Sequence, residues 1–81
     1  MIRLMLLDDH VLVRTGYRRL FDAEPDLRVV CEAAGADEAC ACLREREIDV
    51  AVVDLSLKGA SGIEAIRRIL QRNRAIRVLV L

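Results

Sequence analysis

Four short apolar runs, separated by segments with helical spacing, constrain the fold of this chain more than any other feature of its sequence. The runs cover residues 2–7, 27–34, 50–53 and 76–81. Between them, apolar residues recur every three to four positions, which is the spacing of one face of an α-helix. This order of strands and helices predicts one α/β domain with right-handed crossovers and a parallel sheet.

The composition of the runs predicts their positions in the sheet. Residues 50–53 are apolar throughout, as expected for a strand covered on both faces. The second run alternates, with Arg28 and Glu32 on one side, which favours an edge position. Its apolar residues, expected together on the other side, are Leu27, Val29, Cys31 and Ala33. The predicted fold is a flavodoxin-like doubly wound sheet with strand order 2-1-3-4.

Apolar stripes and end signals define the three helices. The first stripe precedes Pro25, which marks the end of the helix. Asp37 and Glu38 open the second helix, where acids interact favourably with the helix dipole. Ser61 and Glu64 form an S-x-x-E capping box at the start of the third. The three expected inward stripes are Val13, Tyr17, Leu20 and Phe21; Ala36, Ala39, Cys40 and Leu43; and Ile63, Ile66 and Leu70.

Charge and cysteine content limit the classes of function. Thirteen basic and thirteen acidic residues cancel, and no charged block suggests that this chain itself binds nucleic acid or a membrane. Cys31, Cys40 and Cys42 are too few for a structural zinc site with one histidine, so free, buried thiols in a reducing cytoplasm are expected. The first apolar run is too short for a signal peptide.

Three acids follow two of the predicted strands. Asp8 and Asp9 come directly after the first run, and Asp54 ends the third. Ligands bind at the carboxyl ends of strands in an open parallel sheet, and neighbouring strands lie about 4.8 Å apart. If the first and third strands are neighbours, the three carboxylates share one crevice. They would repel one another unless a cation lay among them, and oxygen ligands of this kind suit Mg²⁺.

A carboxylate beside such an ion can attack phosphorus and form an acyl phosphate. Simpler interpretations remain open at this point. Asp8 and Asp9 could serve only as a helix cap, and His10 is most simply a surface residue of the first turn. Lys58 fits a solvated turn residue.

The acidic pair, the distant aspartate and the following "LSLKGASG" turn together resemble the receiver domain of two-component response regulators. The segments "DDHVLVRTGYRRLF" and "DLSLKGASGIEAI" are similar to the subfamily whose receivers are joined to a C-terminal helix-turn-helix DNA-binding domain. The resemblance covers the whole chain. It implies phosphorelay signalling in which a parent protein regulates transcription through a region outside these residues.

The resemblance also implies roles for individual residues. Asp54 matches the phosphoacceptor, which receives a phosphoryl group from a phosphohistidine of a sensor histidine kinase. Asp9 matches the acid that binds Mg²⁺ directly, and Asp8 matches its neighbour, which acts mainly through water. Ser56 lies where the family offers a backbone carbonyl to the metal, and Gly62 matches the turn glycine.

Two departures from the family pattern stand out. Lys58 replaces the usual proline, which leaves the loop freer and is expected to change the phosphorylation or dephosphorylation rate. The chain also ends on the fourth strand, so residues 1–81 are expected to form a partial receiver. It would lack the fifth strand, the last two helices, the Ser/Thr switch residue and the phosphate-binding lysine. The fourth strand would then be an exposed apolar edge, and self-association is expected.

Two other functions compete with a phosphorylated receiver. A phosphohydrolase of the haloacid dehalogenase type also uses an aspartate after a strand, but it needs a second acid two positions later, where this chain has Ser56. Alternatively, the acids could be inactive and the domain could act only by pairing with a partner. DNA binding by this chain is not expected, because its arginines are spread over several faces.

Overall fold

Seven elements form the fold in the order expected from the sequence. The computed structural model describes residues 1–54 and 62–81. In chain order the elements are β1 (Ile2–Leu7), α1 (Val11–Asp22), β2 (Leu27–Ala33), α2 (Ala36–Glu45), β3 (Val50–Val53), α3 (Gly62–Arg72) and β4 (Arg77–Val80). Ser61 of the predicted capping box lies outside the described residues.

The strands form one parallel sheet in the order β2-β1-β3-β4, which confirms the predicted order. β1 lies beside β3, with Leu7 opposite Val53 at the carboxyl end. Because β3 is central and covered on both faces, all four of its residues are apolar. In this part of the chain, β2 and β4 are the two outer strands.

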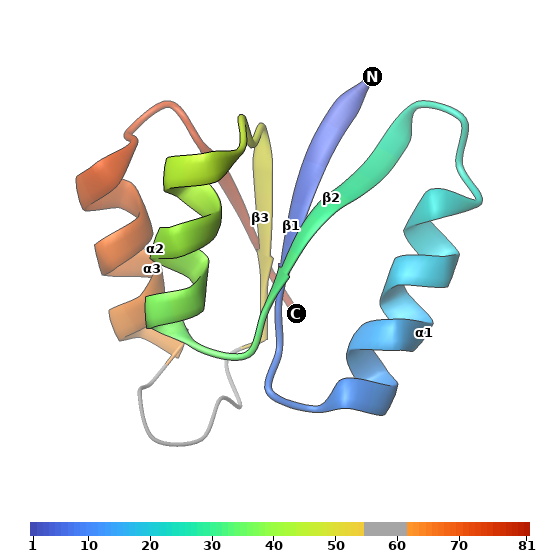
Figure 1. Ribbon diagram of the computed structural model, residues 1–81, viewed down its shortest axis with the longest axis horizontal. Helices are drawn as coiled ribbons and strands as arrows, with labels where there is room; N and C mark the ends of the chain where they lie inside the picture. The colour runs from blue at the N-terminus through green and yellow to red at the C-terminus, as the bar shows by residue number, and fades with distance from the viewer. Residues whose placement is uncertain (55–61) are drawn as a thin grey trace.

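Helices cover both faces of the sheet, as Figure 1 shows, with α2 and α3 on one face and α1 on the other. Successive strand residues point to opposite faces, so each strand supplies two cores. The larger core joins Met5, Leu7 and Val53 to the inner faces of α2 and α3. The smaller core joins Leu4, Leu6, Val29 and Val52 to the two aromatic residues of α1, Tyr17 and Phe21.

A bulge in β2 corrects the predicted alternation of that strand. Leu4 of β1 pairs with Val29, but the next residue, Met5, pairs with Cys31, so Val30 is an extra residue in the ladder. An extra residue reverses the facing of everything after it. Leu27 and Val29 therefore pack in the α1 core, whereas Cys31 and Ala33 pack on the α2 side. The prediction that these four residues share one face was wrong.

The same bulge explains why the prediction of three free thiols was wrong. Turned toward α2, Cys31 forms a disulfide with Cys42, and the Cα atoms of the two residues are 6.2 Å apart. That separation lies within the range that a disulfide can bridge. Cys40, on the same helix, is a free and buried thiol as expected.

Two of the predicted helix stripes are partly wrong. Tyr17 and Phe21 of α1 pack against the sheet, but Val13 and Leu20 are exposed. In α3 the buried apolar positions are Ala65 and Ile69, while Ile63 is exposed. Each helix therefore contacts the sheet through a narrower strip than its apolar spacing suggests. The stripe of α2 is confirmed at three positions, Ala36, Ala39 and Cys40, and Leu43 packs against the same core.

An ion pair fastens the amino end of the sheet. The Arg3 guanidinium donates to both carboxylate oxygens of Asp49, at 3.0 and 3.1 Å, and the Arg3 amide donates to the same carboxylate at 2.7 Å. Arg3 also contacts the exposed Glu47. The side-chain hydrogen bond from Arg3 is the main reason that the pKa of Asp49 falls from 3.8 to about 2. The Asp49 carbonyl in turn accepts from the Arg77 amide, so one residue links three strands.

We predict that Asp49→Asn removes a component of stability that depends on pH. Because the folded-state pKa is below the ordinary value, the carboxylate stabilises the fold fully above pH 3.8, and this contribution is lost as the pH falls toward 2. Urea denaturation of wild type between pH 7 and pH 2 should therefore show a loss in this window that the variant lacks. Glu47→Gln removes an equal charge from an exposed partner of Arg3 and is the matched control. Equal pH profiles for the two variants would contradict the prediction.

We also predict that the Cys31–Cys42 bond contributes measurably to stability. A disulfide that closes a loop of 11 residues restricts the unfolded chain by about 2 to 3 kcal/mol. Adding a thiol reductant should lower the free energy of unfolding by about this amount, as measured by urea denaturation. Cys42→Ala should abolish the effect of the reductant, whereas Cys40→Ala should keep it. A reductant effect that persists in Cys42→Ala would exclude the assignment.

Candidate functional site

Asp8 and Asp54 both lie at the carboxyl edge of the sheet. Asp8 follows β1, and its amide donates to the Ala33 carbonyl at the end of β2, at 3.0 Å. Asp54 follows β3, and its amide donates to the Leu7 carbonyl at the end of β1, also at 3.0 Å. The ladder therefore continues one residue beyond each strand. Both aspartates are fixed by the main chain of a neighbouring strand.

Asp8 and Asp54 line the same small cavity. Its volume is about 10 Å³, and Tyr17, Arg14 and Leu81 lie in the same lining. The pairing of β1 with β3 therefore brings together two residues that lie far apart in the sequence. Asp9 adjoins Asp8, and its side chain is also mostly buried.

Asp8 is the one charged residue classed as buried among residues 1–54 and 62–81, with 3% of its surface exposed. Its Oδ1 atom accepts a hydrogen bond of 2.8 Å from the His10 amide. The Oδ2 atom is buried and accepts no hydrogen bond from the residues that the structure describes. A buried carboxylate oxygen in this state carries a desolvation cost that a bound cation would remove.

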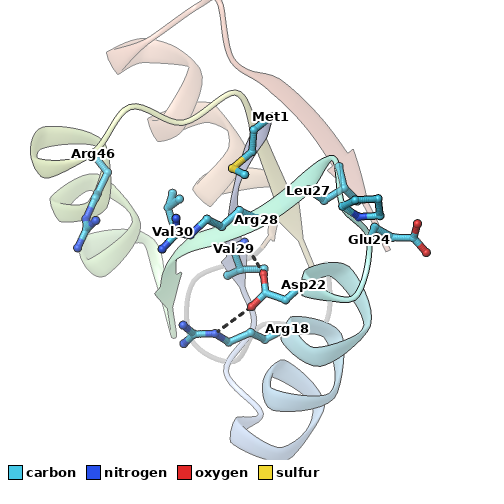
Figure 2. Close-up of a pocket in the computed structure, with 10 residues that line it drawn as sticks. Met1, Arg18, Asp22, Glu24, Leu27, Arg28, Val29, Val30 and Arg46 are labelled. Carbon is cyan, nitrogen blue, oxygen red and sulfur yellow. Dashed lines mark hydrogen bonds and ion pairs between the residues drawn. The ribbon is translucent and has the colours of Figure 1, made fainter.

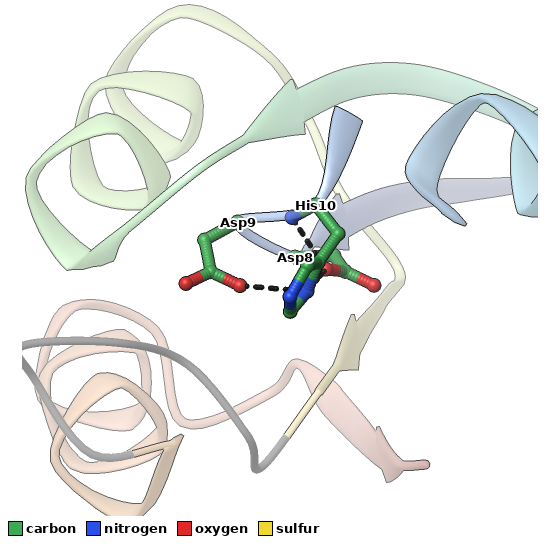
Figure 3. A group of neighbouring side chains, drawn as sticks. All are labelled: Asp8, Asp9 and His10. Carbon is green, nitrogen blue, oxygen red and sulfur yellow. Dashed lines mark hydrogen bonds and ion pairs between the residues drawn. The ribbon is translucent and has the colours of Figure 1, made fainter. Parts of the chain in front are cut away.

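His10 lies over the acidic pair, as Figure 3 shows. Its Nδ1 atom is 3.2 Å from Asp8 Oδ1 and 3.0 Å from Asp9 Oδ1, and about half of its side chain is exposed. Sequence reasoning treated His10 as a surface residue and missed both contacts, although the contiguous D-D-H was a visible signal. His10 is also the N-cap residue of α1, and Asp8 Oδ1 accepts from its amide, so Asp8 does hold the turn into this helix.

The residues present fit a hard divalent cation. Asp8, Asp9 and His10 can each offer a ligand atom, and these atoms lie within 4.8 Å of one another, whereas Asp54 does not belong to this group. Carboxylate oxygens are the preferred protein ligands of Mg²⁺. Ser56 and Lys58 lie outside the described residues. Gly62 is the first residue of α3 and is buried.

A wider hollow lies away from the acids. It has a volume of about 640 Å³ and adjoins the start of β2 and Met1 (Figure 2). There Asp22 accepts a 2.8 Å hydrogen bond from the Val29 amide, on the outer edge of β2, and Arg18 lies 3.6 Å from the same carboxylate. A charged side chain that occupies an edge amide protects the strand from pairing. The polar side chains in this hollow therefore stabilise the fold by protecting the edge of β2.

Comparison with known proteins assigns the chain to a family. The profile of the response regulator receiver domain matches residues 4–81. This chain belongs to the response regulator receiver family. No helix in residues 1–54 or 62–81 has both the length and the apolar character needed to cross a bilayer.

Curated relatives of the chain are transcriptional response regulators. It is 36% identical over 81 residues to the response regulator UvrY of Escherichia coli and 37% identical to the transcriptional regulatory protein LiaR of Bacillus subtilis. It is 42% identical to the DNA-binding transcriptional activator DevR/DosR of Mycobacterium tuberculosis. All 81 residues are covered in each case, but the chain spans only 37% to 38% of the relatives' own length.

Solved structures agree with this receiver fold. A LuxR-family two-component response regulator from Aurantimonas is 51% identical, with a TM-score of 0.89, over 96% of this chain and 56% of that one. The response regulator domain of Thermotoga maritima CheB is 30% identical, also with a TM-score of 0.89, over 99% and 59%. The predicted receiver fold is confirmed.

Proposed function

We propose that this receiver domain is cytoplasmic and accepts a phosphoryl group on Asp54 from the phosphohistidine of a sensor histidine kinase, with Mg²⁺ bound at the nearby acids. The phosphorylated domain would then regulate transcription through a DNA-binding region of its parent protein. Family membership and the transcriptional relatives support this proposal. The chain itself would act as a phosphoacceptor, catalysing at most its own phosphorylation and dephosphorylation.

The placement of Asp54 beside Asp8 is the observation that carries the proposal. The Asp54 amide is anchored to Leu7, and both aspartates line one cavity at the carboxyl edge of the sheet. Phosphoryl transfer depends mainly on positioning and on neutralising charge. Asp8, which lines the same cavity as the acceptor, and the adjoining Asp9 would supply carboxylate oxygens for the neutralising cation.

Each residue has a chemical task in this proposal. An Asp54 carboxylate oxygen forms a bond to phosphorus while the phosphorus–nitrogen bond of the donor histidine breaks, and the electron pair of that bond returns to the imidazole. Asp9 would bind Mg²⁺ directly, Asp8 mainly through water, and Asp54 and the Ser56 carbonyl would complete the protein ligands. When bound, the metal offsets the negative charge shared by the acceptor and the incoming phosphoryl group.

We predict that incubation with acetyl phosphate and Mg²⁺ adds one phosphoryl group to the protein. The Asp54 carboxylate would attack the phosphorus of acetyl phosphate, and acetate would leave with the bridging oxygen. Intact-protein mass spectrometry would detect the gain. Asp54→Asn should abolish it, and Asp9→Asn should reduce it at least tenfold by weakening metal binding. Asp49→Asn, an aspartate change at the opposite end of the sheet, is the matched control and should leave it unchanged.

The outcomes separate this proposal from its alternatives. No mass gain in wild type would favour an interaction module in which the acids do not react. Steady turnover of a phosphate ester, with no accumulated phosphoprotein, would favour a hydrolase. A gain that persists in Asp54→Asn would place the acceptor elsewhere.

Self-association is a second part of the proposal. β4 is an outer strand, and Leu79, Val80 and Leu81 are 48%, 42% and 49% exposed. Leu79 pairs with Val52 and so faces the α1 side of the sheet, where Leu20 is also exposed. An apolar outer strand of this kind pairs readily with another chain.

We predict that light scattering at increasing concentration will show a dimer or a larger assembly of the 81-residue chain. Leu79→Lys places a charge on the exposed side of β4 and should shift the equilibrium toward monomer. Ile63→Lys alters an apolar residue of α3 that is also exposed, and it is the control. A wild-type monomer at high concentration would remove this part of the proposal.

A further inference from the structure

We infer that Arg14 is a positioning residue that fixes the main chain between Asp8 and Asp9 for metal binding. This inference rests on the proposed function, because it assigns the acidic pair to a metal. Arg14 belongs to α1 and is not expected to touch the metal or the phosphoryl group. Its role is carried by two hydrogen bonds of a largely buried side chain.

The Arg14 side chain is only 17% exposed, which is low for an arginine on a helix. Its NH1 group donates to the Asp8 carbonyl at 2.7 Å, and its Nε group donates to Glu32 Oε1 at 3.0 Å. The planar guanidinium has a fixed donor geometry, so one contact constrains the direction of the other. Arg14 thus links the acidic turn to β2.

The bulge in β2 makes this link possible. Because Val30 is the extra residue, Glu32 faces α1 and not α2. Glu32 is mostly buried and accepts from two arginines, Arg14 through Oε1 and Arg18 through Oε2. The second contact holds the glutamate in the position that Arg14 requires.

Fixing the Asp8 carbonyl also fixes Asp9. The carbonyl of Asp8 and the amide of Asp9 belong to one planar peptide unit. On the preceding side, the Asp8 amide is held by Ala33. The turn is therefore restrained on both sides of Asp8, and the start of Asp9 cannot rotate without breaking the hydrogen bond from Arg14. Groups that hold metal ligands in this way commonly contribute tenfold or more to metal affinity.

Positioning and charge predict opposite changes in Mg²⁺ affinity when Arg14 is removed, which makes the inference testable. A guanidinium near a cation site repels the cation, so removing it should strengthen Mg²⁺ binding if only charge matters. If positioning dominates, removing it should weaken binding. The sign of the change therefore distinguishes the two.

The decisive comparison is Arg14→Met against Arg18→Met, with the Mg²⁺ dissociation constant measured by isothermal titration calorimetry on the 81-residue chain. Both variants remove one positive charge and one partner of Glu32, but only Arg14 reaches Asp8. We expect Arg14→Met to weaken Mg²⁺ binding about tenfold and Arg18→Met to change it less than twofold. Arg14→Lys keeps the charge but cannot hold both acceptors, so it should lie between Arg14→Met and wild type.

A measurement without metal makes the test independent of the proposed function. Amide hydrogen exchange followed by NMR reports on the His10 amide, which donates to Asp8 Oδ1. We expect Arg14→Met to speed exchange at His10 about tenfold, relative to Arg18→Met, with Ile69 of the core as the reference for global unfolding. A general loss of stability would speed both amides together.

The results can be told apart. Equal exchange at His10 and equal or tighter Mg²⁺ binding in Arg14→Met would overturn the role of Arg14. If wild type bound no Mg²⁺, or bound it as weakly as Asp9→Asn, the proposed metal site would fail. The role of Arg14 in holding the turn would then be decided by the exchange rates alone, and equal rates would overturn it.

Discussion

The parallel pairing of β1 with β3 is the constraint on which the candidate site depends. It aligns Leu7 with Val53, so the next residue on each strand is an aspartate at the same edge of the sheet. The hydrogen bond from the Asp54 amide to Leu7 continues that alignment into the turn. A shift of one residue in this register would turn the apolar residues of β3 to the wrong faces, so the hydrophobic cores and the site are fixed by the same choice.

The order of elements and the place of the acids followed from sequence because both depend on strong local patterns. Four apolar residues before Asp54 indicate a central strand, and neighbouring central strands bring their carboxyl ends together. The bulge at Val30 has no such pattern, since an alternating run looks the same with or without an extra residue. The Cys31–Cys42 bond and the position of Glu32 depend on the bulge, and sequence reasoning missed both.

The prediction of which helix residues face the sheet was partly wrong for a different reason. Spacing identifies which residues share a helical face, but not which part of that face meets the sheet. In α3 the small Ala65 and the larger Ile69 are fully buried, whereas Ile63 is exposed. Likewise, α1 has no buried residue, and its apolar packing against the sheet comes from two partly buried aromatic side chains. Packing between elements decides these positions, and a single sequence does not contain it.

The two ends of the sheet differ in how their carboxylates are satisfied, and this difference supports the proposed metal site at the carboxyl end. At the amino end, the Arg3 guanidinium satisfies both oxygens of Asp49, and the pKa of that carboxyl is low. At the carboxyl end, Asp8 is more deeply buried, yet its Oδ2 atom lacks a hydrogen bond from the described residues, and the nearby Arg14 contacts its main-chain carbonyl. An arginine that satisfied the Asp8 side chain would stabilise the fold but would occupy the oxygen that a cation needs. With the guanidinium directed to the main chain, the turn would be restrained and that oxygen would stay available to the proposed metal.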